Sequence, residues 1–174
     1  TYDAAGRVTA TRYPDGTAET YEYDGTGNLT AKTDRGGRTT RHTYDDKGRL
    51  VAIENPLGGV AAYGYDEFGN LTSVTDAAGK TTATEYNDRC QPTKRTLPGG
   101  ATRTWTYDAA GRIASFTDEM GQLRTYAYDG NGMLATIAYD DGSIETMLRN
   151  GNGRVLSRED AYGTTSYQYN VGEQ

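Results

Sequence analysis

Short segments of alternating side chains recur along the whole chain, each six or seven residues long and bounded by turn residues. Residues 49–54 read Arg-Leu-Val-Ala-Ile-Glu, and residues 17–23 read Thr-Ala-Glu-Thr-Tyr-Glu-Tyr. Threonine, valine, isoleucine and tyrosine in period-two alternation are typical of β-strands. The pattern therefore predicts an all-β chain with almost no helix.

A Tyr-Asp or Tyr-Asn pair marks an internal repeat with a period of 21 residues. A fixed period of this length indicates stacked supersecondary units. An eighth unit begins at Arg149, where the tyrosine is lost, and a ninth begins at Tyr169 after a one-residue deletion. We expect a single repeat array over residues 1–174, with units that start near residues 2, 23, 44, 65, 86, 107, 128 and 149 and a ninth near 169.

Each unit contains two turn signals. The first is Asp-x-x-Gly directly after the tyrosine, and the second ends in a glycine about ten residues later. Asp or Asn first, Pro second and Gly fourth are the preferences of a type I turn, in which the acidic side chain accepts amide N–H bonds and glycine adopts positive φ. The residues predicted to hold the structure together are Tyr2, Tyr23, Tyr44, Tyr65, Tyr107 and Tyr128, Asp3, Asp24, Asp45, Asp66, Asp108 and Asp129, and Gly16, Gly37, Gly58, Gly79, Gly100, Gly121, Gly142 and Gly163.

Two strands and two turns in each unit predict an antiparallel meander of about sixteen short strands. If both turns were identical three-residue loops, equivalent positions would be an even number of residues apart, whereas the period is odd. Because a one-residue slip moves every side chain to the other face, each repeat must contain one bulge or one longer loop. The preferred register pairs Tyr23 with Leu29 and Tyr21 with Ala31, and the threonine columns face the opposite side.

The composition fits a sheet without a conventional aliphatic core. Leu, Ile, Val and Phe together number 21 of 174 residues, whereas there are 15 tyrosines and 23 glycines. Tyrosine rings suit a half-buried sheet surface. Sixteen strands at about 4.8 Å spacing make an open sheet about 75 Å wide, which we expect to curve. Its free edges are expected to pair with a partner or with each other.

Several classes are excluded by the same counts. The net charge of −6, with lysine and arginine scattered among the acids, argues against a nucleic-acid-binding surface. No apolar run approaches the length of a membrane span. The single cysteine, Cys90, excludes an intrachain disulfide framework and a cysteine-based zinc site.

Residues 44–50, Tyr-Asp-Asp-Lys-Gly-Arg-Leu, resemble the signature of the Rhs or YD-repeat family, and close variants occur at residues 2–8, 65–71 and 107–113. This family includes bacterial Rhs polymorphic toxins, the cocoon-forming components of insecticidal toxin complexes, wall-associated proteins and teneurins. The resemblance implies a β-sheet strip that spirals into a hollow shell. In bacterial members that shell encloses a toxic C-terminal domain until delivery, often by type VI secretion.

The resemblance implies a structural segment of such a shell, with no catalysis, no cofactor and no metal. Its implied partners are the remaining repeats of a parent shell and an enclosed C-terminal effector domain, with no nucleic acid and no membrane span, in a secreted or delivered bacterial protein. About eight repeats are too few to enclose a domain, and the Asp-Pro-x-Gly-Leu segment that ends bacterial shells is absent. We therefore expect a piece of a longer protein.

The fifth repeat departs from the pattern, because Cys90 occupies a turn-glycine position and Pro92 occupies the usual aliphatic position. These replacements predict a local distortion there. His42 is the only histidine and lies more than two repeats from Cys90, which argues against a catalytic Cys–His pair. Adjacent acids such as those at 45–46 are expected to cap turns, and stacked acidic turns leave calcium binding as a minor alternative.

Two larger alternatives remain. Aromatic-rich hairpin repeats of similar length also form carbohydrate- and choline-binding modules, in which exposed rings stack on the ligand. Such modules favour tryptophan, and this chain has only Trp105. For the fold, two units give four strands and approach the length of one propeller blade, although successive units look equivalent rather than alternating.

Overall fold

The structure is a computed structural model that describes residues 1–169. These residues form sixteen strands and no helix, in one antiparallel sheet whose strand order follows the sequence from β1 to β16. The predicted all-β meander is confirmed. The strands are β1 (Ala10–Arg12), β2 (Ala18–Tyr23), β3 (Leu29–Thr33), β4 (Thr39–Tyr44), β5 (Leu50–Glu54), β6 (Val60–Tyr65), β7 (Leu71–Thr75), β8 (Thr81–Tyr86), β9 (Pro92–Thr96), β10 (Thr102–Tyr107), β11 (Ile113–Thr117), β12 (Leu123–Tyr128), β13 (Leu134–Tyr139), β14 (Ile144–Arg149), β15 (Val155–Asp160) and β16 (Gly163–Ser166).

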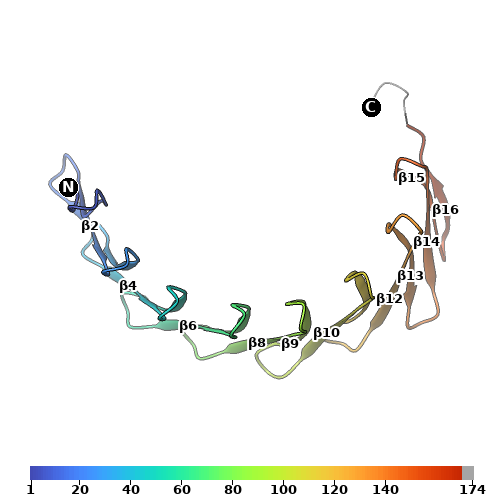
Figure 1. Cartoon of the computed structure of the whole chain (residues 1–174), viewed down its shortest axis with the longest axis horizontal. Coiled ribbons are helices and arrows are strands. Elements are labelled where there is room, and N and C mark those ends of the chain that lie inside the picture. The colour runs from blue at the N-terminus through green and yellow to red at the C-terminus, as the bar shows by residue number, and fades with distance from the viewer. Residues whose placement is uncertain (170–174) are drawn as a thin grey trace. The chain divides into compact units, whose positions relative to one another are not determined.

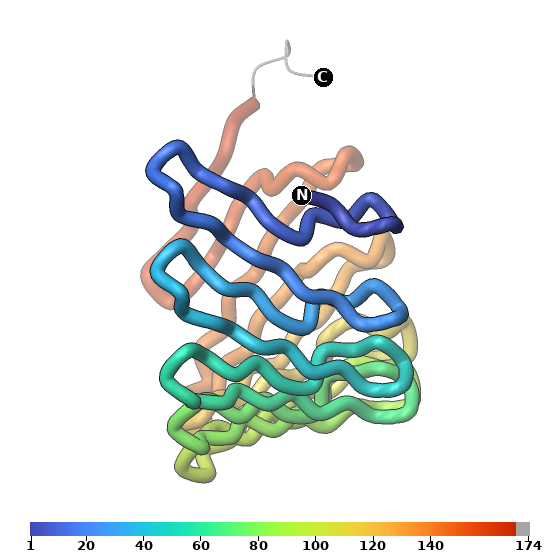
Figure 2. Tube along the Cα trace, turned by 90° about the vertical axis from the view of Figure 1, so that its left-hand side faces the viewer, coloured from blue at the N-terminus to red at the C-terminus, as the bar shows by residue number. Residues whose placement is uncertain are grey.

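The strands belong to two compact units. The first, Thr1–Tyr86, contains β1 to β8, and the second, Asn87–Gln174, contains β9 to β16. Within each unit every strand except the last is followed by a tight turn and then by its antiparallel neighbour (Figure 1). In the first unit the chain runs back and forth between two rows of turns (Figure 2). The ninth repeat beyond Tyr169 lies outside the described residues.

Both turns of a repeat have the same hydrogen-bond pattern. In a first turn, the Gly6 N–H donates to the Asp3 carbonyl (3.0 Å) and the Asp3 N–H donates to the Arg7 carbonyl (2.9 Å). In a second turn, Gly37 and Asp34 make the same two bonds at 3.0 and 2.9 Å. This is a type I turn closed by a glycine in the left-handed region, as predicted. The turn before Gly163 differs, because Asp160 pairs directly with Gly163 across a two-residue loop.

The odd residue of the period is a bulge inside a strand. Between β2 and β3, Glu22 pairs with Ala31 and the next pair is Tyr23 with Leu29, so Thr30 is the extra residue. The same shift recurs between Thr43 and Tyr44, Gly64 and Tyr65, Thr106 and Tyr107, Ala127 and Tyr128, and Leu148 and Arg149. The predicted irregularity is confirmed in these six strand pairs, since identical turns leave the strand as the place for the extra residue.

The predicted register is correct on one side of the bulge and wrong on the other. Tyr23 pairs with Leu29 as expected, but Tyr21 pairs with Lys32 rather than with Ala31. The bulge lies between these two pairs and shifts the second by one residue, so Ala31 faces Glu22 and not the tyrosines. A tyrosine–leucine–alanine face does not form.

Burial in the described residues is shallow, as the scarcity of aliphatic side chains predicts. Ala31, at 2% exposure, is the one buried hydrophobic residue among them, and Thr84 and Glu145 are the buried polar ones. The joint tyrosines discussed below are half-buried. The backbone ladder and polar contacts, such as Thr33 Oγ1 to Thr39 Oγ1 at 2.8 Å, therefore hold neighbouring strands together.

The distortion expected in the fifth repeat is absent. Cys90 adopts φ 59°, and its N–H donates to the Asn87 carbonyl at 2.9 Å as a turn glycine would. The Asn87 side chain fixes this turn by accepting the N–H groups of Arg89 and Gln91, both at 3.0 Å. Pro92 stands at the first position of β9, where a strand tolerates proline. The turn hydrogen bonds outweigh the local preference of cysteine.

Candidate functional site: the joints between repeats

Each joint begins with the tyrosine of one repeat, which reaches back to the preceding repeat. The Tyr44 hydroxyl donates to the Leu29 carbonyl at 3.0 Å, so it crosses from the end of β4 to the start of β3. That carbonyl belongs to the peptide unit that joins Leu29 to the bulged Thr30. The hydroxyl thus satisfies a carbonyl at the irregular point of the ladder. Equivalent bonds of 2.8–3.0 Å join Tyr23 to Val8, Tyr65 to Leu50, Tyr86 to Leu71, Tyr107 to Pro92 and Tyr128 to Ile113.

The aspartate that follows the tyrosine organises the first turn. Asp45 Oδ1 accepts the N–H groups of Lys47 (3.0 Å) and Arg49 (2.9 Å), while Oδ2 accepts Arg49 Nε at 2.7 Å. These bonds, led by the one from the Arg49 backbone, hold the pKa of Asp45 below its usual value. An aspartate at this position accepts the N–H of the residue four positions later in the turns of Asp3, Asp24, Asp66, Asp108 and Asp129.

An arginine after the turn glycine completes the joint. The Arg49 guanidinium carbon lies 4.8 Å from the centre of the Tyr65 ring, and Arg49 Nη1 donates to the Asp66 carbonyl at 2.9 Å. One guanidinium therefore links its own turn to the tyrosine and the turn of the next repeat. Such stacking contributes about 0.5–1 kcal/mol at an exposed position. The other stacked pairs are Arg7 with Tyr23 (4.6 Å), Arg112 with Tyr128 (4.3 Å) and Arg154 with Tyr169 (5.2 Å).

The sequence prediction named the tyrosines and aspartates that lie at these joints, but it did not name the arginines. The available signal was the position directly after the turn glycine, which holds arginine at 7, 49, 112 and 154. The predicted second-turn glycines lie elsewhere, in the other row of turns, and all have positive φ. Tyr2 is 72% exposed and makes an isolated bridge with Val8.

The eighth repeat replaces the tyrosine but keeps the bond. Arg149 Nε donates to the Leu134 carbonyl at 3.3 Å, where the other repeats use a tyrosine hydroxyl. The residue that would stack on it is Met133 rather than an arginine. Two guanidinium groups therefore do not face each other at this joint.

The single histidine and the single cysteine of the chain belong to different compact units. Cys90 is an exposed free thiol in the second unit, and His42 belongs to β4 of the first. His42 Nδ1 is buried without a hydrogen-bond partner. Residues 1–169 contain no group of three or more His, Cys, Asp or Glu side chains that could hold a metal ion. Glu119 accepts Arg103 Nε and Nη2 at 2.6 and 2.9 Å, and this ion pair lowers its pKa to about 2.

The family model described as RHS Repeat matches six overlapping segments, residues 2–39, 23–60, 44–82, 65–102, 86–115 and 107–144. The chain belongs to the RHS repeat family. No curated protein matches it. In the part of the chain that the structure describes, no helix has the length and hydropathy needed to cross a membrane.

Solved structures share the fold of this RHS repeat chain. The crystal structure of TcdB2–TccC3 matches it with a TM-score of 0.59 at 16% identity, over 95% of this chain and 12% of the other. TcdB2–TccC3 without its hypervariable C-terminal region matches with a TM-score of 0.55 at 17% identity. The match covers 91% of this chain and 11% of the other. The Photorhabdus luminescens Tc holotoxin pore, with a TccC3 mutation, matches with a TM-score of 0.51 at 17% identity. The match covers 91% of this chain and 11% of the other. This RHS repeat array thus spans about one eighth of the chains that it resembles.

Proposed function

We propose that this RHS repeat array is a stretch of the wall of a β-shell that encloses a C-terminal toxin or effector domain, and that it has no catalytic activity of its own. The observation that supports this most directly is the joint, because the same tyrosine bond fastens repeat after repeat along a continuous ladder. The proposal is also supported by the fold shared with TcdB2–TccC3, of which a structure without its hypervariable C-terminal region matches as well.

Such a wall would keep proteases away from the enclosed domain. In a ladder of paired strands the backbone N–H and C=O groups are already bonded, so a protease cannot take the strand as an extended substrate. The turn aspartates and arginines keep the rims polar while they fasten the repeats. Further repeats would pair with β1 and β16, each of which has one neighbour in the sheet. We infer that the strip is part of a secreted or delivered bacterial effector.

The experiment uses the longer protein that contains these repeats. It is purified under native conditions and again in denaturant, and each sample is separated by size. A C-terminal piece that stays with the repeats natively, resists added protease and separates in denaturant is the expected result. A single intact chain whose C-terminal region is digested at the rate of an unprotected domain would overturn the proposal.

A carbohydrate-binding surface module is the less favoured function. Stacking on a sugar needs a free ring face, whereas the rings of Tyr23, Tyr65 and Tyr128 are half-buried and each has an arginine over it. Their hydroxyls are also committed to backbone carbonyls. Saturable glycan binding that is lost on replacing these tyrosines would favour the module over the shell.

A further inference from the structure

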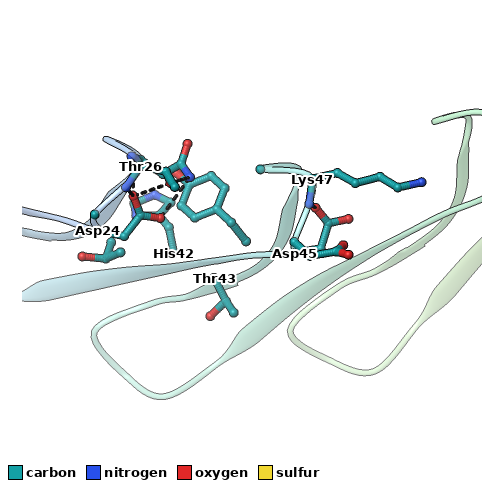
Figure 3. A pocket seen from close by; sticks show the side chains of 12 residues that line it. Asp24, Thr26, His42, Thr43, Asp45 and Lys47 are labelled. Carbon is teal, nitrogen blue, oxygen red and sulfur yellow. Dashed lines mark hydrogen bonds between the residues drawn. The ribbon is translucent and has the colours of Figure 1, made fainter.

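The second repeat lacks the arginine that covers the next tyrosine. Asn28 occupies the position of Arg7 and Arg49, and in residues 1–169 no arginine or lysine lies over the Tyr44 ring. An open pocket of about 650 Å³ is found there, between the turn of Asp24 and the turn of Asp45 (Figure 3). A smaller pocket of about 310 Å³ lies beside Tyr107. At that joint Gln91 occupies the position of the arginine. At these two joints a pocket lies where the arginine is missing.

The groups that an arginine would engage are still present around the pocket. The Asp24 carboxylate accepts Thr26 Oγ1 at 2.7 Å and Asn28 Nδ2 at 2.9 Å, and among the described residues its partners are neutral groups only. The Asp45 carbonyl is the counterpart of the Asp24 and Asp66 carbonyls, which accept Arg7 Nη1 (3.4 Å) and Arg49 Nη1 (2.9 Å). An acidic site with an uncovered ring is thus complementary to a guanidinium.

His42 adds an imidazole that the other joints lack. It lines the pocket, and its Nδ1 is buried without a hydrogen-bond partner. Figure 3 shows His42 close to Asp24 and Thr26 on one side of the pocket, with Asp45 and Lys47 on the other. A neutral imidazole nitrogen can accept an N–H group. Asn70 replaces the arginine at the joint of Tyr86, as Asn28 does at the joint of Tyr44. Thr84 stands there in the place of His42, so the inference is confined to the joint of Tyr44.

We propose that this pocket binds the guanidinium group of an arginine side chain supplied by another polypeptide segment. The guanidinium stacks on the Tyr44 ring and donates to the Asp45 carbonyl and to the Asp24 carboxylate, as the chain's own Arg7 and Arg49 do at their joints. The pocket is larger than one guanidinium, so the side chain and part of its backbone can enter. This binding does not depend on whether the array encloses a domain.

The test is a titration of the isotope-labelled chain with N-acetyl-arginine amide, followed by the backbone amide signals. Saturable shifts are expected at Thr26, Asn28 and Lys47. N-acetyl-citrulline amide has nearly the same shape without the charge and is expected to bind at least about tenfold more weakly. Equal binding of citrulline, or binding of a neutral sugar in its place, would overturn the proposal.

Two matched variants locate the site. Asn28→Arg supplies the missing guanidinium in cis and is expected to abolish binding. Asn70→Arg makes the same change at the Tyr86 joint, where Thr84 stands in the place of His42, and is expected to leave the shifts at Thr26 unchanged. Unchanged spectra away from the substituted joint show that each variant is folded. Retained binding by folded Asn28→Arg would refute the assignment, and loss of binding in folded Asn70→Arg would refute the location of the site.

Discussion

Gly79 tests how much of the stability of the turns rests on backbone conformation alone. It closes the turn that begins at Asp76, has φ +78°, and donates its N–H to the Asp76 carbonyl at 2.9 Å. A Cβ added at Gly79 would meet no atom within 4 Å, so Gly79→Ala introduces no clash. Alanine in the left-handed conformation lowers the free energy of unfolding by about 1–2 kcal/mol. About 0.4–1 kcal/mol of this is regained because alanine restricts the unfolded chain. We expect a net loss of about 1 kcal/mol.

The matched control is Gly25→Ala in the same compact unit. Gly25 also lies in a turn with no atom within 4 Å of an added Cβ, but its φ is outside the left-handed region. The same chemical change there should stabilise the chain by about 0.4–1 kcal/mol. Gly79→Val should be worse than Gly79→Ala, at about 1–3 kcal/mol, because a β-branched side chain tolerates positive φ least.

The assay is urea unfolding followed by circular dichroism, with the midpoint compared at constant slope. A constant slope shows that stability has changed rather than the compactness of either state. The expected result is a lower midpoint for Gly79→Ala and an equal or higher one for Gly25→Ala. If both variants shift the midpoint in the same direction by the same amount, the assignment of Gly79 as a turn-closing left-handed residue is refuted.

Three further predictions concern the joints and the surface. Tyr65→Phe removes the donor to the Leu50 carbonyl and should cost about 0.5–1.5 kcal/mol in the same urea assay, whereas an unchanged midpoint would contradict the joint. Cys90 is the one non-glycine residue with positive φ among the described residues, and Cys90→Gly removes the cost of that conformation. The free energy of unfolding should rise by up to about 1 kcal/mol and the urea midpoint with it, whereas a lower midpoint would contradict a strained Cys90. The pKa of Glu119 is depressed to about 2 from 4.5 by Arg103, so the stability that this pair adds is present above about pH 4.5 and is lost as the pH falls toward about 2. The midpoint of Glu119→Gln should accordingly be below that of the parent chain at neutral pH and converge with it in acid, and a gap that persists at low pH would contradict the ion pair.

The strands, the turns and the presence of an irregularity were predictable because each depends on local chemistry that repeats. The four-residue pattern Asp-x-x-Gly predicts the turn, and the first and second turns of a repeat have the hydrogen bonds expected from it. Counting alone showed that each repeat has one residue over, because the period is odd, but it left open a bulge or a longer loop. The structure shows the bulge. Cys90 shows the limit of such local arguments. Its turn is fixed by Asn87 and the flanking ladder, and that context overrides the preference of a single residue.

The position of the bulge could not be found by counting, and the face of each side chain depends on it. Placing the extra residue at Thr30 moves Ala31 to the side of Glu22 and brings Lys32 beside Tyr21, with its ammonium 5.6 Å from the ring centre. The stacking of Arg49 on Tyr65 was hidden for the same reason. The two residues are far apart along the chain and meet only once the register between β4, β5 and β6 is known.

The substitutions in this chain indicate that the parts of a joint act as a unit. Where the tyrosine becomes Arg149, the residue that would stack on it is Met133, so the two positions have changed together and the bond to the Leu134 carbonyl is kept. Where Gln91 replaces the arginine, its Nε2 donates to the Gly111 carbonyl at 2.7 Å and partly bridges to the next turn. Asn28 is too short to do this and bonds only within its own turn, to Asp24 and Thr26. Tyr44 therefore keeps its bond to the preceding repeat but has an uncovered ring. The joint of Tyr86 shares this condition, and what distinguishes the joint of Tyr44 is the pocket beside the ring and the His42 that lines it.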